Sequence, residues 1–293
     1  RLQECATRYG AAAFEDGDTL LRSGAVDAVS ICTPPALHRM LTVLAAGLGV
    51  HVLCEKPMAP TLADCDAMIE ACEAGGVCLM VAQKKRFHPL VQRVRSLSEG
   101  PLGVIRWAVV KYALGRVNMP WFWDENDGGG PLQENAIHAV DTLRYLMGDV
   151  EMVMAAGGNL FNSKHEPQLD TAAVSLQFQS GAIAALGLGQ ASEWEFADEH
   201  FFFACDGGEA RFSGRFDMPT HWWMALRGSP TDPEMEQVPE DDCFDREIAH
   251  FLECVRTGAQ PAVTGESARG SVAVTLAIKR SVRRQHPVYM RLR

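Results

Sequence analysis

The sequence predicts an α/β protein with a parallel sheet at its start and a mostly antiparallel sheet after it. Three short apolar runs alternate with helical segments, and they lie at residues 26–32, 50–54 and 77–82. This alternation is typical of a doubly wound parallel sheet that is covered on both faces. Later strand-like runs follow one another through short turns, as antiparallel strands do. We therefore expect two domains, residues 1–100 and residues 101–293.

Capping residues and glycines set the expected helix ends in the first hundred residues. A helix over residues 36–46 carries leucines on one face and ends at Gly47. Thr61, with Asp64 three residues later, predicts the start of the next helix, which runs to residue 74. Further helices are expected at residues 1–9, 19–22 and 89–97.

The second part begins with a long expected strand and a helix that follows three glycines. Asp206-Gly207-Gly208 separates two strand-like runs and predicts a hairpin. Residues 214–242 are rich in Pro, Asp and Glu, so we expect a loop there with at most one strand. The expected strands are 102–114, 171–179, 181–190, 200–205 and 209–213, and the expected helices are 133–147, 245–256 and 268–282.

Composition excludes several classes of protein. The net charge of −10 disfavours a nucleic-acid or anionic-membrane partner. No apolar run approaches the roughly 20 residues of a membrane span, and the polar start has no signal-peptide pattern. The nine cysteines form no C-x-x-C pair, so we expect reduced thiols in a cytoplasmic protein and no metal site.

The strand at residues 50–54 ends abruptly in Glu55-Lys56-Pro57. In an open α/β sheet the ligand crevice lies outside the carboxyl ends of the strands. Glu55 and Lys56 could form a surface ion pair worth about 0–1 kcal/mol. Alternatively, Lys56 in a crevice beside a cationic ring would have a lowered pKa and would pass a proton near neutral pH.

Two other strand ends are expected at the same crevice. Thr33-Pro34-Pro35 closes the first strand, and the helix after it would present its N-terminus to an anion. His38 would contact the ligand there, or would simply be a solvated helix residue. Gln83 and Arg86 follow the third strand and would face either a ligand or solvent.

A glycine run at residues 128–130 leads into a helix that carries an acid and an imidazole. Glu134 and His138 are four residues apart and share one helix face. Asp141 stands three residues after His138 and could orient it. This pattern favours a site over a structural histidine. Trp121-Phe122-Trp123, just before the glycines, would pack in the core or form a wall for a sugar ring.

Taken together, these three groups of residues resemble the glucose–fructose oxidoreductase / inositol dehydrogenase family, known as Gfo/Idh/MocA. The resemblance covers nearly the whole chain. It implies an N-terminal Rossmann domain that binds NAD or NADP, and a C-terminal domain on a large, mostly antiparallel sheet. It also implies hydride transfer between the nicotinamide and a carbon that bears a hydroxyl, on a sugar, inositol or related polyol.

The resemblance assigns roles to single residues. Lys56 matches the lysine that hydrogen-bonds the reacting hydroxyl, and His138 matches the acid–base histidine. Glu134, where Asp is more common in the family, matches the assisting carboxylate. The implied cofactor contacts are Thr33, Pro34, His38, Glu55 and Lys56. The family also implies a homodimer or homotetramer through the second sheet.

Two other functions remain open for a chain of this kind. It could be a non-catalytic regulator that binds sugar or cofactor, or it could cleave glycosides with a transient, NAD-dependent hydride transfer. The family begins with a strand, a Gly-rich turn and a helix, whereas this sequence begins with Arg1 inside an expected helix. We therefore expect a chain that lacks the first βαβ unit, with an incomplete Rossmann sheet and little affinity for NAD.

Overall fold

The first sheet of the protein is parallel, as expected. The computed structural model describes residues 2–229, 231–241 and 243–290. In these residues the first sheet has three strands in the order β1-β2-β3, with both pairings parallel. We call residues 2–98 the first unit; its elements are α1 (Leu2–Tyr9), α2 (Gly17–Arg22), β1 (Ala28–Ile31), the 3₁₀ helix η1 (Pro35–Leu37), α3 (His38–Gly47), β2 (His51–Glu55), α4 (Leu62–Gly75), β3 (Leu79–Ala82), the 3₁₀ helix η2 (Lys84–Phe87) and α5 (Pro89–Ser98).

The second sheet is large and mostly antiparallel. Its nine described strands run in the order β11-β10-β9-β8-β4-β7-β6-β5-β12, and the β4–β7 pairing is parallel. We call residues 105–237 the second unit. The elements after α5 are β4 (Ile105–Gly115), α6 (Pro120–Trp123), α7 (Pro131–Met147), β5 (Val150–Gly158), η3 (Ser163–His165), β6 (Thr171–Phe178), β7 (Ile183–Ser192), η4 (Trp194–Phe196), β8 (Asp198–Cys205), β9 (Gly208–Arg215), β10 (Met218–Leu226), β11 (Glu234–Gln237), α8 (Phe244–Thr257), α9 (Gly265–Arg284) and β12 (Val288–Tyr289).

These elements confirm the expected fold class and correct two details. Residues 214–242 hold two strands, β10 and β11, rather than a loop with at most one strand. Residues 230 and 242 of that segment lie outside the described residues. Strand β5 was not expected, because its run of Met, Ala and Gly carries few of the β-branched residues that favour strands.

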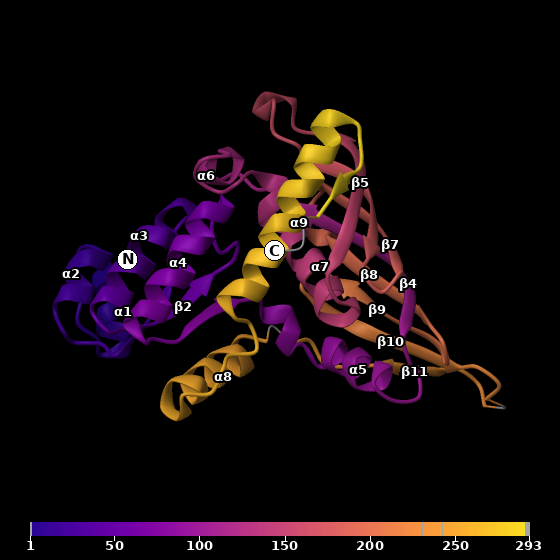
Figure 1. Ribbon diagram of the computed structural model, residues 1–293, viewed down its shortest axis with the longest axis horizontal. Coiled ribbons are helices and arrows are strands. Elements are labelled where there is room, and N and C mark those ends of the chain that lie inside the picture. The colour runs from indigo at the N-terminus through magenta and orange to yellow at the C-terminus, as the bar shows by residue number, and fades with distance from the viewer. Residues whose placement is uncertain (1, 230, 242, 291–293) are drawn as a thin grey trace.

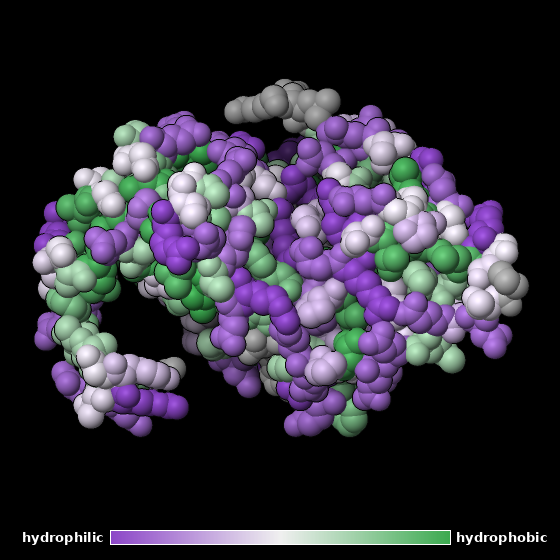
Figure 2. Space-filling model, turned by 90° about the horizontal axis from the view of Figure 1, so that it is seen from below, coloured by the Kyte–Doolittle hydropathy of each residue, from purple (hydrophilic) through white to green (hydrophobic). Residues whose placement is uncertain are grey.

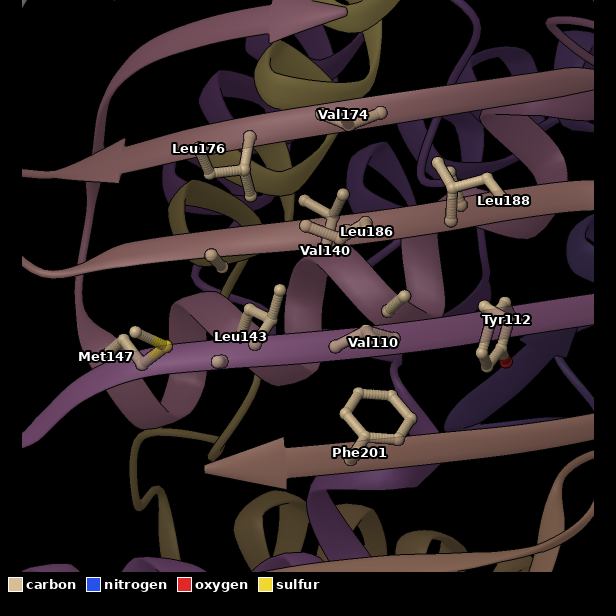
Figure 3. Packing of buried hydrophobic residues seen from close by; sticks show 14 of the residues in the cluster. Val110, Tyr112, Val140, Leu143, Met147, Val174, Leu176, Leu186, Leu188 and Phe201 are labelled. Atoms are coloured by element: carbon tan, nitrogen blue, oxygen red, sulfur yellow. The ribbon is translucent and has the colours of Figure 1, made fainter. Parts of the chain in front are cut away.

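One face of the nine-stranded sheet is covered by helix α7 (Figure 3). Val140 and Leu143 of the helix pack against Val110, Leu186 and Phe201 of the sheet, and all five are nearly inaccessible. Apolar residues that recur every three to four positions on α7 therefore meet the alternate residues of the strands. Burial of this face leaves the N-terminal end of α7 to point toward the first unit.

Helix α9 connects the two units (Figure 1). Its Ala268 and Val272 belong to the apolar core of the first unit, whereas its Val274, Ala277 and Ile278 belong to the core of the second. The C-terminal part of the chain thus contributes to both cores. The division at residue 100 stays a prediction.

Helix α1 and the outer surface of α3 are exposed. Helix α1 buries none of its residues, and the exposed apolar residues of this region include Met40 and Val43 of α3. Figure 2 shows a hollow on this side of the molecule, at the left of the view, with hydrophobic residues along one wall. No helix within the described ranges has the length and apolar character to cross a bilayer.

Candidate active site

The carboxyl ends of the three parallel strands meet at one edge of the first sheet. Ile31 of β1 is paired with Cys54 of β2, and Glu55 of β2 is paired with Ala82 of β3. The residues that follow these strands therefore lie along the same edge. Glu55 stays close to its own chain there, because its carboxylate accepts a hydrogen bond of 3.0 Å from the backbone N–H of Lys56.

His38 holds this edge together instead of facing a ligand. Its ring is completely buried. Nε2 lies 2.8 Å from the carbonyl oxygen of Thr33, and Nδ1 lies 3.2 Å from the carbonyl oxygens of Pro57 and Met58. The expected direct contact between His38 and the cofactor is therefore wrong for this conformation, because a ring without exposed surface can act only by fixing the two turns.

The glycines before α7 allow close contacts within the chain. Gly129 and Gly130 both have φ of +79°, a conformation that favours glycine. A Cβ on Gly129 would lie 2.6 Å from the Gln133 side chain, and one on Gly128 would lie 2.8 Å from the carbonyl oxygen of Trp121. The run thus joins α6 tightly to the N-terminus of α7, and Trp121 and Glu134 line one cavity.

Lys56 and Glu134 meet between the two units. The Lys56 Nζ lies 2.5 Å from Glu134 Oε1 and 3.2 Å from the Glu134 carbonyl oxygen. Burial disfavours the charged lysine, but the Glu134 carboxylate outweighs it and raises the pKa of Lys56. The lowered pKa expected for Lys56 is therefore wrong for the protein alone, since its nearest partner is an anion. Burial also raises the pKa of Glu134, and Lys56 opposes this effect.

His138 lies one helical turn after Glu134 and is 5 % exposed. Its Nδ1 is buried without a hydrogen-bond partner. Burial holds the pKa of His138 well below the ordinary value, and nearby Asp217 opposes this effect. The ring is therefore neutral near pH 7, which is the form that can accept a proton.

Asp141 does not orient His138. Its two oxygens accept hydrogen bonds of 2.7 Å from the Arg86 guanidinium, and one of them also accepts a bond of 2.8 Å from Ser271. The expectations for Asp141 and for Arg86 at the crevice are both wrong, because the two side chains neutralise each other inside the protein. Three residues beyond His138, the helix has turned Asp141 toward this partner.

A cavity of about 450 Å³, which we call the central cavity, contains the expected reactive groups. Trp121 and Phe122 form part of its wall, so the aromatic run divides between the two expected roles. Trp123 is buried and stacks on His165 with ring centroids 4.1 Å apart. The lining residues used below are Glu55, Lys56, Lys84, Trp121, Glu134, Asn135, His138, Asp217 and Phe244.

Asp217 and Lys84 were missed as site residues. Asp217 lies in a tight turn between β9 and β10 with φ of +66°, and Lys84 opens η2 just after β3. Their side chains form an ion pair of 3.1 Å. The sequence position of Lys84, two residues after a strand that ends at the crevice, was a usable signal. Asp217 had none, because nothing local marks the turn in which it lies.

The edge of the first sheet fits the nicotinamide end of a dinucleotide. The hydroxyl of Thr33 and both amide atoms of Gln83 are buried and have no hydrogen-bond partner among the described residues. Thr33 follows β1 and Gln83 follows β3. Unsatisfied buried polar groups at the carboxyl edge of a parallel sheet fit a bound polar ligand. Among the described residues, no group of three or more His, Cys, Asp or Glu side chains is placed to hold a metal ion.

A lysine at the carboxyl edge of the parallel sheet thus meets a carboxylate from the second unit, at a cavity that an imidazole also lines. The oxidoreductase family model with an NAD-binding Rossmann fold matches residues 1–83, and the Gfo/Idh/MocA C-terminal domain model matches residues 91–211. The chain belongs to the Gfo/Idh/MocA family of oxidoreductases.

Three relatives illustrate the similarity. D-apiose dehydrogenase of Paraburkholderia graminis is 30% identical, in an alignment that covers 95% of this chain and 76% of the relative. The aldose-aldose oxidoreductase of Caulobacter crescentus, solved with glycerol, is 28% identical with a TM-score of 0.86, over 99% of this chain and 88% of that one. The WlbA dehydrogenase of Bordetella pertussis, solved with NADH and UDP-GlcNAcA, is 25% identical with a TM-score of 0.84, over 100% of this chain and 88% of that one. This family membership makes the chain an NAD(P)-dependent oxidoreductase.

Proposed function

We propose that the protein moves a hydride between the nicotinamide of NAD(P) and a secondary hydroxyl of a sugar, inositol or related polyol. One observation carries this proposal. Lys56 from the first unit and Glu134 from the second meet at 2.5 Å in the wall of a cavity that His138 also lines. Three polar groups therefore converge where one carbinol would be bound.

Each of these residues has a distinct part in the reaction. Lys56 remains protonated and donates a hydrogen bond to the reacting oxygen. His138, neutral near pH 7, accepts the hydroxyl proton in oxidation and returns it in reduction. Glu134 holds Lys56 in position through Oε1. A bound nicotinamide supplies the site that accepts or gives the hydride.

The cofactor contacts are a second part of the proposal. We assign Thr33, Pro34, Glu55 and Lys56 to the nicotinamide end of NAD(P), because they follow β1 and β2 at one edge of the sheet. Thr33→Val should weaken NAD(P) binding, because the buried Thr33 hydroxyl has no other partner. Calorimetry of the wild type and the variant tests this, with Thr231→Val, an exposed site, as the matched control.

The substrate class is tested with a panel of sugars, sugar acids and inositols. We expect at least one to produce reduced nicotinamide, followed by its absorbance, in a reaction that needs both Lys56 and His138. The relatives named above act on D-apiose or on aldoses by name, which places sugars first in the panel. Binding without turnover across the panel would favour a regulator, and release of an aglycone would favour glycoside cleavage.

A homo-oligomer through the open face of the nine-stranded sheet is a further part of the proposal. Trp107, Val109 and Ile183 are exposed there, on the face opposite α7. An apolar face of this kind is typical of a protein interface. Sedimentation velocity should give a dimer or tetramer, and Trp107→Lys should shift it toward the monomer.

All nine cysteines are free, which agrees with the proposed cytoplasmic location.

A further inference from the structure

Asp217 reaches the central cavity from a part of the chain far from the other reactive groups. It follows β9, in a turn whose backbone lies in the left-handed region. Asp and Asn tolerate this region better than other residues that carry a Cβ. Asp217 lines the same cavity as Lys56, Glu134 and His138. The fold therefore brings a second carboxylate to the imidazole.

Three neighbours contact the Asp217 carboxylate, and a fourth holds its backbone. The Nζ of Lys84 lies 3.1 Å from Oδ2, the Nζ of Lys85 lies 3.2 Å from Oδ1, and the Tyr112 hydroxyl donates to Oδ1 at 3.4 Å. The backbone N–H of Asp217 donates to Glu199 at 3.2 Å, and Glu199 also accepts from Lys85 at 2.6 and 2.7 Å. Burial alone would raise the pKa of Asp217, but Lys85, His138 and Lys84 together keep it below the ordinary value. The carboxylate is therefore ionised and held in place.

His138 needs a negative charge nearby when it takes a proton. Asp141 is bonded to Arg86 and Ser271, and the Oε1 of Glu134 is bonded to Lys56. Of the charged groups with the largest effect on the ring, Lys56, Lys84 and Lys85 are cations and Asp217 is a carboxylate. Among these groups, Asp217 is the one whose charge favours the imidazolium form of His138.

We propose that Asp217 is the positioning residue for His138, supplying the fixed negative charge that stabilises the imidazolium during the reaction. The inference rests on the proposed function for its chemical step. In oxidation the substrate O–H bond breaks and its proton forms an N–H bond on His138. The C–H bond breaks with its electron pair, which leaves as hydride to the oxidised nicotinamide, and the carbinol becomes a carbonyl. Asp217 stays ionised throughout and exchanges no proton.

The first test measures the imidazole directly, without cofactor or substrate. The His138 ring is titrated by NMR in the wild type, in Asp217→Asn and in Lys84→Met, and His138→Gln assigns the resonance. Asn keeps the shape and tolerates the turn, so Asp217→Asn removes the charge with little change in size. We expect the midpoint to fall by about 0.5–1 unit in Asp217→Asn and to rise in Lys84→Met. Asp198→Asn, in a carboxylate paired with exposed Lys111, should leave it unchanged.

The second test separates Asp217 from the proposed function. In single-turnover oxidation, Asp217→Asn should slow hydride transfer roughly tenfold or more, with the KM for substrate nearly unchanged. The inference is overturned if Asp217→Asn leaves either the titration midpoint of His138 or the rate of hydride transfer unchanged. The proposed function is upheld separately, by polyol oxidation in the wild type. If the titration midpoint of His138 shifts but the protein oxidises no polyol, the proposed function is wrong and the coupling between Asp217 and His138 is upheld. If Asp217→Asn does not fold, a Lys84→Met midpoint that fails to rise overturns the inference.

Discussion

Helix α7 carries two buried ion pairs that differ in how completely they are satisfied. In the pair of Arg86 with Asp141, both carboxylate oxygens are bonded, and the guanidinium also donates to Ser267 and to the carbonyl oxygen of Ala262. In the pair of Lys56 with Glu134, Oε1 is bonded but Oε2 is buried without a partner. A saturated pair can only hold structure together. A pair with an unused oxygen at a cavity can take up a ligand, and this difference separates the structural from the reactive end of the helix.

The largest effect is expected from Lys56→Ala, which removes the reactive pair. We expect kcat to fall by about 10²–10⁴, because the hydrogen-bond donor to the reacting oxygen is lost. The affinity for NAD(P) should change much less. Steady-state kinetics and calorimetry measure the two quantities, with Lys111→Ala, an exposed lysine, as the control. Near-full turnover in Lys56→Ala would show that the pair is not reactive.

The structural pair is broken by Asp141→Ala, which leaves the Arg86 guanidinium buried and unpaired. We expect the free energy of unfolding to fall by about 3–5 kcal/mol, measured in urea. Asp206→Ala is the matched control, because Asp206 makes a similar two-bonded pair with Arg106 at the surface. Asp206→Ala should lower the free energy of unfolding by only about 0–1 kcal/mol. Equal losses in the two variants would contradict the distinction between the pairs.

Glu247 extends the comparison to a buried carboxyl group that forms no ion pair with another described residue. Its Oε1 is unpartnered, and burial raises the pKa of Glu247 to about 8. The folded protein therefore holds a proton that the unfolded chain releases, so stability is highest below the ordinary pKa and falls as the pH rises toward 8.

Glu247→Gln should remove this dependence. Between about pH 5 and pH 8, we expect the wild type to lose on the order of 2–4 kcal/mol of unfolding free energy relative to the variant. Urea denaturation at both pH values measures this difference in the free energy of unfolding. Glu253→Gln, an exposed residue of the same helix, should follow the wild type. Parallel curves for wild type and Glu247→Gln would mean that Glu247 is already ionised when folded.

The smallest effect is expected at Trp121, which sharpens the assignment of the cavity as a substrate site. Trp121→Leu keeps an apolar wall but removes the aromatic face. We expect the KM for a sugar substrate to rise roughly three- to tenfold, which corresponds to about 0.5–1.5 kcal/mol of ring packing. The kcat value should change little. Trp223→Leu, on the open face of the sheet, serves as the control, and an equal rise in KM there would remove the case for stacking.

The sequence predicted the sheets well because their signals are local. Short apolar runs between helices, and the hairpin at Asp206-Gly207-Gly208, needed no knowledge of distant partners. Strand β5 and one of the two strands β10 and β11 were missed, because Ala and Gly, or Pro and loop-like neighbours, hid the alternation along them. The grouping of Lys56, Glu134 and His138 at one site came from the family resemblance, since Lys56 belongs to a different unit from the other two residues.

Errors at the site came from partners that are distant in sequence. Helical spacing placed Asp141 near His138, but spacing cannot reveal that Arg86 reaches Asp141 first. The same limit misplaced the pKa of Lys56, whose partner Glu134 comes from another unit. Asp217 depends on a left-handed turn and two lysines from η2, so no segment near it in the sequence carried the signal.

The placement of α9 restricts how the enzyme can open. Because residues of this one helix are buried in both hydrophobic cores, a hinge that swung the units apart would have to expose apolar side chains to water. Substrate traffic must then pass over the rim of the central cavity, where Asn118 and Met119 are exposed. We therefore expect local adjustments of that rim during turnover, while the contact between Lys56 and Glu134 is kept.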